Sequence, residues 1–385
     1  AARPLEKISL SDPVRDTVDH AVTTNGNRIL YRWTGRDIPR MFPEPSMPSR
    51  ASVVQRVLVS TIPEWEELSR WYWNLSKPHH DAVTPAMKEK VAELTAEAAA
   101  REENIRAIFT WVSQNIRYMG ITLEEEAPGY EPHDVDLTFD RGYGVCRDKA
   151  ALLVAMLRLA GFDAYPVLMM VGPKKDERVP QPWFNHAIVG VREPDGLFRL
   201  MDPTDENTRN LLPRYLCDMS YLAATPEGVP LMTSPVYPAE ENLARIETEG
   251  RLEADGRLRA ETRIVFEGIN DSAYRGHFAR LRPGEREDFF EGRIEALVPG
   301  AELRDLEIEP QPVRDTSRPL KAVFSWTADG LFAEQGDRRL FRPPEWGQIF
   351  GVTRSALSHT GLEEREYPLR TRFPSGVEES FRLEL

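Results

Sequence analysis

The spacing of apolar and polar positions changes twice along the chain and divides it into three parts. Residues 1–62 contain short alternating stretches, 28–33 and 53–60, and this period of two predicts half-buried strands. The proline-rich run 39–48 predicts an extended loop between them. Because these strands have no evident partner sheet, we interpret 1–62 as the end of a truncated N-terminal β domain.

Residues 63–235 change to a helical period and then to short apolar runs. Apolar residues that recur every three or four positions predict helices over residues 63–75, 85–100, 103–115 and 146–160. Gly161 stands where a glycine commonly ends such a helix. Apolar runs predict strands over residues 164–171, 186–192 and 197–201. Glu193-Pro-Asp-Gly196 supplies a turn between the last two strands, and residues 120–143 are expected to form an irregular loop.

After residue 235 helical patterns become scarce and the alternation returns. The alternating segments predict strands over residues 245–253, 257–266, 303–308 and 320–328, with a hairpin around 374–376. One amphipathic helix is expected over 278–297, with a break at Pro283. Residues 236–385 are therefore predicted to form a C-terminal antiparallel β-sandwich with one helix, and the whole chain is predicted to be an α+β protein.

The composition excludes several kinds of partner. The chain of 385 residues has 62 acidic and 49 basic side chains, a net charge of −13, which disfavours binding to nucleic acid or to anionic lipid. The longest wholly apolar run, Ala150–Leu157, is too short to span a membrane. Two cysteines are too few for a disulfide framework or a multi-cysteine zinc site. Since the chain starts with Ala1-Ala2 and not with Met, we expect that it was processed or cut from a longer protein.

The candidate nucleophile is Cys146, in the stretch Gly142-Tyr-Gly-Val-Cys-Arg-Asp-Lys149. A glycine-containing turn places it in the first turn of the predicted helix. Unpaired backbone N–H groups and the positive end of the helix dipole favour a thiolate there. Arg147 and Lys149 add positive charge, while Asp148 opposes them. The alternative interpretation is a small buried residue at the start of a core helix.

A histidine and an aspartate flank the predicted turn further along the chain. His186 begins one strand and Asp202 follows the other. Positions symmetric about the turn of an antiparallel hairpin face each other, with Cβ atoms about 4.5–5.5 Å apart. Direct pairing of these two residues requires a three-residue loop or a bulge. The Asp202 carboxylate would then orient the His186 imidazole beside a thiolate, although each residue on its own is also common without a catalytic role.

Five segments carry a resemblance to a known family. They are Trp111–Tyr118, Cys146–Lys149, Ala150–Gly161, Asn185–Val189 and Leu200–Thr204. In this order and spacing they resemble the bacterial transglutaminase-like superfamily, over about residues 63–225. The resemblance implies a papain-like core in which Cys146 is the nucleophile, His186 the general base and acid, and Asp202 the orienting carboxylate. The subfamily that the chain resembles has β-rich domains of unknown function on both sides of this core.

The resemblance also implies an oxyanion hole that includes the backbone N–H of Cys146. The candidates for a second donor or for substrate contact are Gln114, Asn115, Tyr118 and Trp183. Each of these is equally explained as an ordinary capping or packing residue. The chain has no calcium loop of EF-hand type, and we predict neither a metal nor a cofactor. A Cys146–Cys217 disulfide is the alternative that would silence the nucleophile in an oxidising compartment.

We therefore predict three domains: the β segment 1–62, a transglutaminase-like catalytic core at 63–235, and the β-rich domain 236–385. The predicted function is cysteine-dependent acyl transfer from amides. Hydrolysis of a peptide or protein substrate is favoured over transfer to an amine because water is always present as an acceptor. The alternatives are a noncatalytic module that binds peptides and an assembly protein whose C-terminal β domain binds a protein or cell-envelope partner. The resemblance places the protein in the periplasm or cell envelope.

Overall fold

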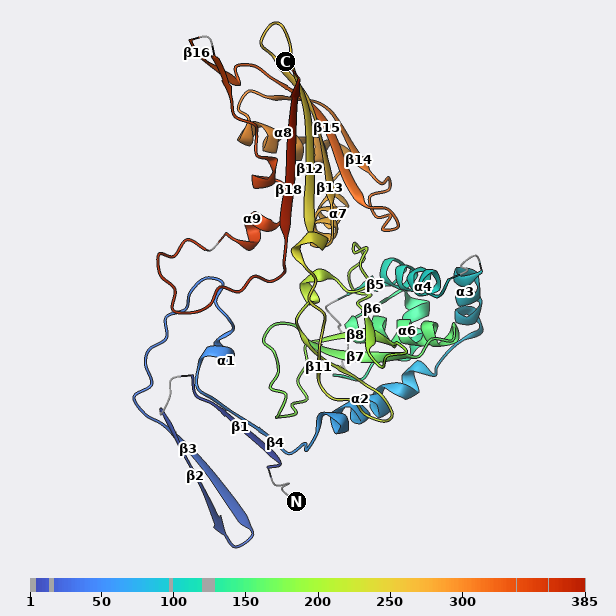
Figure 1. The fold of residues 1–385 in the computed structure, drawn as a ribbon. Helices are drawn as coiled ribbons and strands as arrows, with labels where there is room; N and C mark the ends of the chain where they lie inside the picture. The colour runs from blue at the N-terminus through green and yellow to red at the C-terminus, as the bar shows by residue number, and fades with distance from the viewer. Residues whose placement is uncertain are drawn as a thin grey trace. The chain divides into compact units, whose positions relative to one another are not determined.

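The chain folds into two compact units, each built from both helices and strands (Figure 1). The computed structural model describes residues 5–13, 17–96, 100–119, 129–336, 338–358 and 360–384. The first unit comprises Ala1–Thr204, Asp218–Pro235 and Leu362–Arg370, and the second comprises Asp205–Cys217, Val236–Gly361 and Thr371–Leu385. The mixture of helices and strands confirms the predicted α+β class.

The first part of the chain forms two separate pairs of strands. β1 (Lys7–Ser11) pairs with β4 (Arg56–Ser60), and β2 (Val18–Asn25) pairs with β3 (Arg28–Gly35). Both pairs are antiparallel. The strand expected over 53–60 begins only at Arg56, because α1 (Arg50–Val53) precedes it. The proline-rich run 39–48 contains no helix or strand, as predicted.

Four helices of the first unit pack against a central helix, α6 (Cys146–Leu159), that begins at the candidate nucleophile. They are α2 (Trp65–His80), α3 (Pro85–Thr95), α4 (Arg101–Asn115) and α5 (Val135–Arg141). Every residue of α6 from Asp148 to Leu157 is buried. The helix stops at Gly161, whose φ of +84° suits a glycine and whose N–H bonds back to the Arg158 carbonyl.

One helix was not expected from the sequence. α5 lies inside the stretch 120–143, which was expected to be irregular, and residues 120–128 of that stretch lie outside the described residues. α5 spans only seven residues, fewer than the two helical turns over which an apolar period becomes visible. It ends at Gly142, which has a φ of +70°.

The sheet of the first unit is antiparallel throughout its described pairs. Its strands are ordered β11-β10-β7-β8-β9. Their bounds are Ala164–Met170 for β7, His186–Arg192 for β8, Phe198–Met201 for β9, Ser220–Ala223 for β10 and Met232–Thr233 for β11. α6 packs against β7 and β8. A cysteine-bearing helix on an antiparallel sheet is the core that the resemblance implied.

The second unit contains a mixed five-stranded sheet. Its strands are ordered β14-β15-β13-β12-β18. Their bounds are Leu243–Leu252 for β12, Leu258–Phe266 for β13, Glu302–Glu309 for β14, Leu320–Ala328 for β15 and Gly376–Glu384 for β18. Two helices, α7 (Ile269–Phe278) and α8 (Pro283–Leu297), contribute to the same apolar core as the inward-facing side chains of the strands. A two-stranded sheet of β16 (Phe332–Gln335) and β17 (Arg338–Phe341) and a short helix, α9 (Thr353–Ala356), follow.

Two predictions for this region were wrong and one was partly right. The described residues of this region form a five-stranded sheet with helices and a separate two-stranded sheet, and not an antiparallel sandwich. The helix expected over 278–297 is broken at Pro283 as predicted, since Pro283 is the first residue of α8, but α7, which ends at Phe278, was not expected. The hairpin expected around 374–376 is absent, since Gly376 starts β18, which runs parallel to β12. Alternation of side chains is the same in parallel and antiparallel strands, so the pattern did not reveal the partner.

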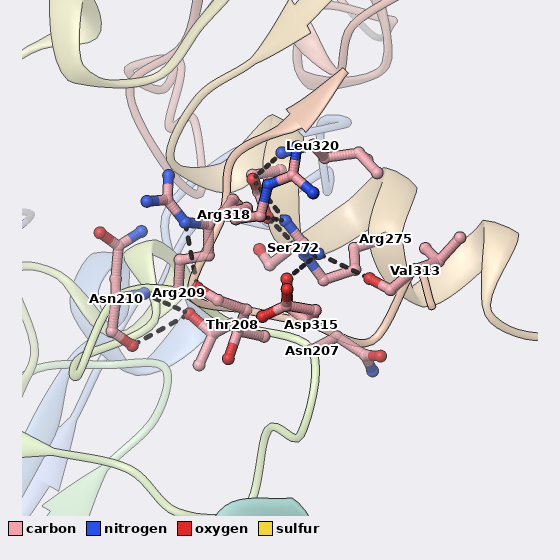
Figure 2. Close-up of polar contacts among 12 residues, drawn as sticks. Asn207, Thr208, Arg209, Asn210, Ser272, Arg275, Val313, Asp315, Arg318 and Leu320 are labelled. Atoms are coloured by element: carbon pink, nitrogen blue, oxygen red, sulfur yellow. Dashed lines mark hydrogen bonds and ion pairs between the residues drawn. The ribbon is translucent and has the colours of Figure 1, made fainter. Parts of the chain in front are cut away.

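A buried arginine organises one end of the second unit (Figure 2). Arg275 of α7 is fully buried and makes a two-pronged ion pair with Asp271. Its guanidinium also donates to the carbonyls of Val313, Asp315 and Arg318. Arg209 donates to the Thr316 carbonyl at 3.1 Å, which fastens the segment 205–217 to the same loop.

His80, the last residue of α2, carries a buried imidazole. Its side chain is 2% exposed, and within the described part of the chain neither ring nitrogen has a hydrogen-bond partner. Burial, followed by the nearby positive charge of Arg158, lowers the pKa of His80 to about 3. The ring therefore stays neutral in the folded protein at any pH at which the protein is expected to work.

The pKa of His80 predicts a loss of stability in acid. The unfolded chain takes up the proton near the ordinary pKa of about 6.5, while the folded chain does not. The free energy of unfolding should therefore fall as the pH drops below about 6.5, by about 2 kcal/mol at pH 5. Denaturant titrations at pH 5 and 7.5 should show this loss in the wild type and its absence in His80→Phe. His20→Phe, at an exposed position of β2, is the matched control; an unchanged pH dependence in His80→Phe would contradict the assignment.

Candidate active site

A tight turn positions the cysteine at the start of α6. β5 (Arg117–Tyr118) runs parallel to β6 (Tyr143–Gly144), which leads directly into the helix. At Gly144 a Cβ atom would come within 2.7 Å of the Asp148 Cβ, so this position requires glycine. Asp148 is buried and accepts hydrogen bonds from the N–H groups of Val145 and His133, at 3.1 and 3.0 Å. These contacts hold the turn, and Cys146 is the first residue of the helix.

The Cys146 thiol is adapted to the thiolate form. Burial by itself raises the pKa of this thiol, but the hydrogen bond to His186 and the charge of its imidazolium outweigh the burial. The backbone N–H groups of Ala187 and Arg147 also lower the pKa of Cys146. The net result is a pKa below that of an ordinary thiol. This is the state that a nucleophilic cysteine requires.

His186 is held between the thiol and a buried carboxylate. Its Nε2 lies 2.8 Å from Oδ2 of Asp202, and the Asp202 side chain is fully buried. Burial alone would lower the pKa of His186, but its hydrogen bonds to Asp202 and Cys146 raise that pKa to about 10. Because Nε2 is bound to Asp202, Nδ1 is the ring nitrogen left to face the thiol. The three groups can thus form a thiolate–imidazolium pair stabilised by a carboxylate.

The hairpin that carries His186 and Asp202 has a different register from the predicted one. β8 and β9 pair Val189 with Met201, and the loop consists of the three residues 194–196. The three-residue loop was expected, but its centre is position 195 and not 194. Continuing the register places position 204, and not Asp202, opposite His186. The prediction that the two residues pair directly was therefore wrong.

The shift of two positions leaves both side chains on one face. Side chains alternate along a strand, so Asp202 is a diagonal neighbour of His186, still within reach of a long side chain. The physical reason lies in the last loop residue, Gly196, which has a φ of +84°. Glycine adopts this conformation readily, so Gly196 belongs to the loop and not to the strand. The sequence alone did not determine where the loop ends.

Thr204 is a site residue that the sequence analysis missed. Both its N–H and its hydroxyl donate to Oδ1 of Asp202, at 2.9 and 2.7 Å. Asp202 therefore uses one oxygen for Thr204 and the other for His186. The motif Asp-Pro-Thr carries a signal for this turn, since an aspartate often accepts from the backbone two residues later. Thr204 fixes the direction of the carboxylate.

We expect Thr204→Val to lower kcat about tenfold with little change in KM. The substitution removes one hydrogen bond to a carboxylate while keeping the backbone donor and the approximate volume. The pH at which Cys146 becomes half reactive should rise at the same time. Thr204→Ser retains the hydroxyl and should keep both properties. Steady-state kinetics together with a pH profile of thiol alkylation check this, and a Val variant as active as the Ser variant would contradict the role.

The four further candidates differ in how the structure places them. Burial, followed by the negative charges of Cys146 and Asp202, raises the pKa of Tyr118. The Tyr118 hydroxyl is therefore electrostatically coupled to these two groups. Asn115 is exposed and its amide donates to the Trp111 carbonyl within its own helix, at 3.0 Å. Gln114 lies half-buried on the last turn of α4, and Trp183 is 57% exposed.

Lys149 has a role that the sequence did not show. It was expected to add positive charge near the thiolate, but its side chain is buried. Its ammonium donates to the carbonyls of Ser113 and Ile116, which end α4. Lys149 thus joins α4 to α6 and supports the segment that leads to Tyr118. Neither cysteine is part of a disulfide, so the alternative disulfide between Cys146 and Cys217 is not formed.

The chain was compared with known proteins. Residues 88–203 match the family model described as the Transglutaminase-like superfamily. The matched range includes Cys146, His186 and Asp202. This segment is therefore a transglutaminase-like core, and the resemblance seen in the sequence is confirmed. No curated protein sequence is significantly similar to the chain.

Several solved structures are similar to this one at low sequence identity. A protein described as a candidate protease from Parabacteroides distasonis is 15% identical, with a TM-score of 0.46, and the match covers 90% of this chain and 66% of that protein. A candidate cysteine protease from Cytophaga hutchinsonii is 13% identical, with coverages of 55% and 67% and a TM-score of 0.27. The periplasmic domain of TgpA from Pseudomonas aeruginosa is 19% identical, with coverages of 52% and 91% and a TM-score of 0.25.

Proposed function

We propose, starting from this transglutaminase-like core, that the protein is a cysteine-dependent enzyme that cleaves amide bonds of peptides or proteins. The observation that supports the proposal most is the 2.8 Å contact between His186 and the buried Asp202. Together with the hydrogen bond between His186 and the Cys146 thiol, it supplies a nucleophile, a base and an orienting group.

The reaction follows from these three groups. The Cys146 thiolate attacks the amide carbonyl, and a C–S bond forms as His186 passes its proton to the leaving nitrogen and the C–N bond breaks. Water then attacks the thioester, His186 takes a proton from it, and the C–S bond breaks to restore the thiolate. Asp202 keeps the imidazole in place and stabilises its charged form in both steps.

The acceptor decides between hydrolysis and transfer to an amine. We assign water as the acceptor, because transfer requires a second site for the amine. To test this assignment, the protein is incubated with a panel of peptides, with and without a small primary amine. The masses of the products are then measured by mass spectrometry. Hydrolysis adds one water to the peptide fragments whether or not the amine is present. A product that carries the amine in place of water would show a transferase, and no product in either case would contradict the proposed activity.

We further propose that Tyr118 contributes to the oxyanion hole with the backbone N–H of Cys146. Its position on β5, beside the turn that leads into α6, and its electrostatic link to Cys146 and Asp202 support this role. Tyr118→Phe should lower kcat by about tenfold to a hundredfold, less than the loss of a fully buried donor, without affecting KM. Tyr143→Phe, a second exposed tyrosine on the paired strand, is the control. Equal kinetics in the two variants would remove Tyr118 from the mechanism.

A location in the periplasm or cell envelope is proposed from the family resemblance. Among the described helices, none has both the length and the apolar composition needed to cross a bilayer. Fractionation of cells that express the complete gene product, with compartment markers, tests the location. Recovery in the cytoplasmic fraction would contradict it.

A further inference from the structure

Lys175 lies in an aromatic environment beside the candidate active site. Its ammonium is 4.7 Å from the centre of the Phe184 ring, 5.6 Å from that of Trp183 and 5.9 Å from that of Trp65. Phe184 and Trp65 are buried, while Trp183 is exposed on the outer side. The ammonium therefore has aromatic faces on several sides and solvent access past Trp183.

The loop around Lys175 is held in place. The backbone N–H of Lys175 donates to the Ser220 hydroxyl at 3.0 Å, and the Trp65 indole donates to the Glu177 carbonyl at 2.8 Å. The hydroxyl of Tyr130 bonds to both the N–H and the carbonyl of Phe184, at 2.8 and 3.1 Å. These contacts fix the backbone of Lys175 and of Phe184, on either side of the ammonium.

The ammonium of Lys175 has no anionic partner among the residues that the structure describes. Asp176, the next residue, binds Ser9 and Arg178, and Asp218 binds the neighbouring Lys174. The exposed Glu177 makes no ion pair with Lys175 in the described part of the chain. Burial lowers the pKa of Lys175 to about 8, which shows that the charge is partly desolvated and not compensated by an anion. Cation–π contacts favour the charge but leave its hydrogen-bonding capacity unused.

The chain itself limits the distance between this site and the thiol. The N–H of Ala187 bonds to the Cys146 sulfur, and Trp183 precedes Ala187 by four residues. A chain of four residues spans at most about 14 Å. The backbone of Trp183 is therefore close enough to Cys146 for one extended peptide of several residues to contact both the thiol and the Trp183–Lys175 pair.

We infer that Lys175, flanked by Trp183, forms a subsite for a carboxylate on the peptide substrate, so that the protein acts on acidic peptides. This inference rests on the proposed function, since it names the substrate class of the same site. The net charge of −13 repels acidic peptides in general, so a preference for them requires a local cation. Lys175 is a cation that no carboxylate of the described chain neutralises, and Trp183 offers an exposed flat surface at its side.

The test uses pairs of capped hexapeptides in which one member has Glu and the other has Gln at a single position. This position is moved along the peptide from one pair to the next. Binding is measured by tryptophan fluorescence at about 0.15 M salt, with the inactive Cys146→Ala protein. At one position or at neighbouring positions, the Glu peptide should bind about tenfold more tightly than its Gln twin, as expected for a charged partner. Adding Lys175→Met should abolish this ratio without changing the affinity for the Gln peptide, while Lys175→Arg should retain most of it.

Lys174→Met is the matched control, because it removes the same charge from the adjacent exposed residue, and it should leave the ratio unchanged. Thermal unfolding of Lys175→Met establishes that the variant is folded. A Glu-to-Gln ratio near one at every position, or a ratio that survives Lys175→Met, would overturn the inference. Turnover of the same peptides by protein with Cys146 intact is measured separately. Selective binding without turnover would refute the proposed enzymatic activity and support the carboxylate subsite. Turnover without selectivity would support the activity and refute the subsite.

Discussion

Cys146→Ala should abolish amide cleavage while leaving the protein folded. Other acyl-transfer triads lose about six orders of magnitude in kcat when the nucleophile is removed, and we expect a loss of similar size here. Among the residues that the structure describes, the thiol contacts His186, Ala187 and Arg147 and forms no disulfide, so thermal unfolding should change little. Peptide turnover and a melting curve of the same sample provide the measurement.

The second cysteine provides the control for this experiment. Cys217 is buried, is in no disulfide and belongs to the second unit. Cys217→Ala should keep full activity, with at most a small loss of stability from the packing of a thiol. Turnover that persists in Cys146→Ala would refute the mechanism. If only Cys217→Ala lost turnover, the nucleophile would be Cys217 and not Cys146.

Asp202→Asn should lower kcat roughly a thousandfold, because the amide cannot stabilise an imidazolium and favours a different histidine tautomer. The pKa of His186 is raised by its bond to Asp202. Loss of the carboxylate should therefore lower the pKa of His186 and raise that of Cys146, so that less thiolate exists near pH 7. The bond from Thr204 to Oδ1 can be retained by the Asn carbonyl oxygen, which keeps the change confined to charge. Kinetics as a function of pH measure both effects.

Asp195→Asn is the control on the same hairpin. Asp195 lies exposed in the loop and accepts a hydrogen bond from the N–H of Leu197. Its replacement should leave kcat and the pH profile unchanged. If the two Asn variants behaved alike, the Asp202 carboxylate would have no specific role in the reaction.

The local elements of the site were predictable because their signals are local. Gly142–Gly144 and the apolar period after Cys146 mark the start of α6, and the bounds predicted for β8 are those observed. The order of Cys146, His186 and Asp202 gave the resemblance that the family match then confirmed. The bounds of these elements depend on residues within a few positions of one another, and the resemblance depends on the order of short local motifs.

The features that the sequence did not reveal depend on details of geometry or on distant partners. The centre of the β8–β9 loop is set by the conformation of Gly196, and a shift there moves the residue opposite His186 by two positions. The partner of β18 is β12, more than a hundred residues earlier, and a parallel pair leaves no turn to announce it. The burial of Lys149 against the end of α4 likewise depends on tertiary packing.

The central claim is that Cys146 and His186 form a thiolate–imidazolium pair. The most direct test is the rate of alkylation by iodoacetamide as a function of pH, with peptide mapping to separate Cys146 from the buried Cys217. The account predicts that Cys146 reacts at a pH well below the ordinary thiol pKa of about 8.5, and that His186→Ala slows the reaction there and moves its profile upward. A Cys146 that titrates like a free thiol, with the same profile in His186→Ala, would contradict the account.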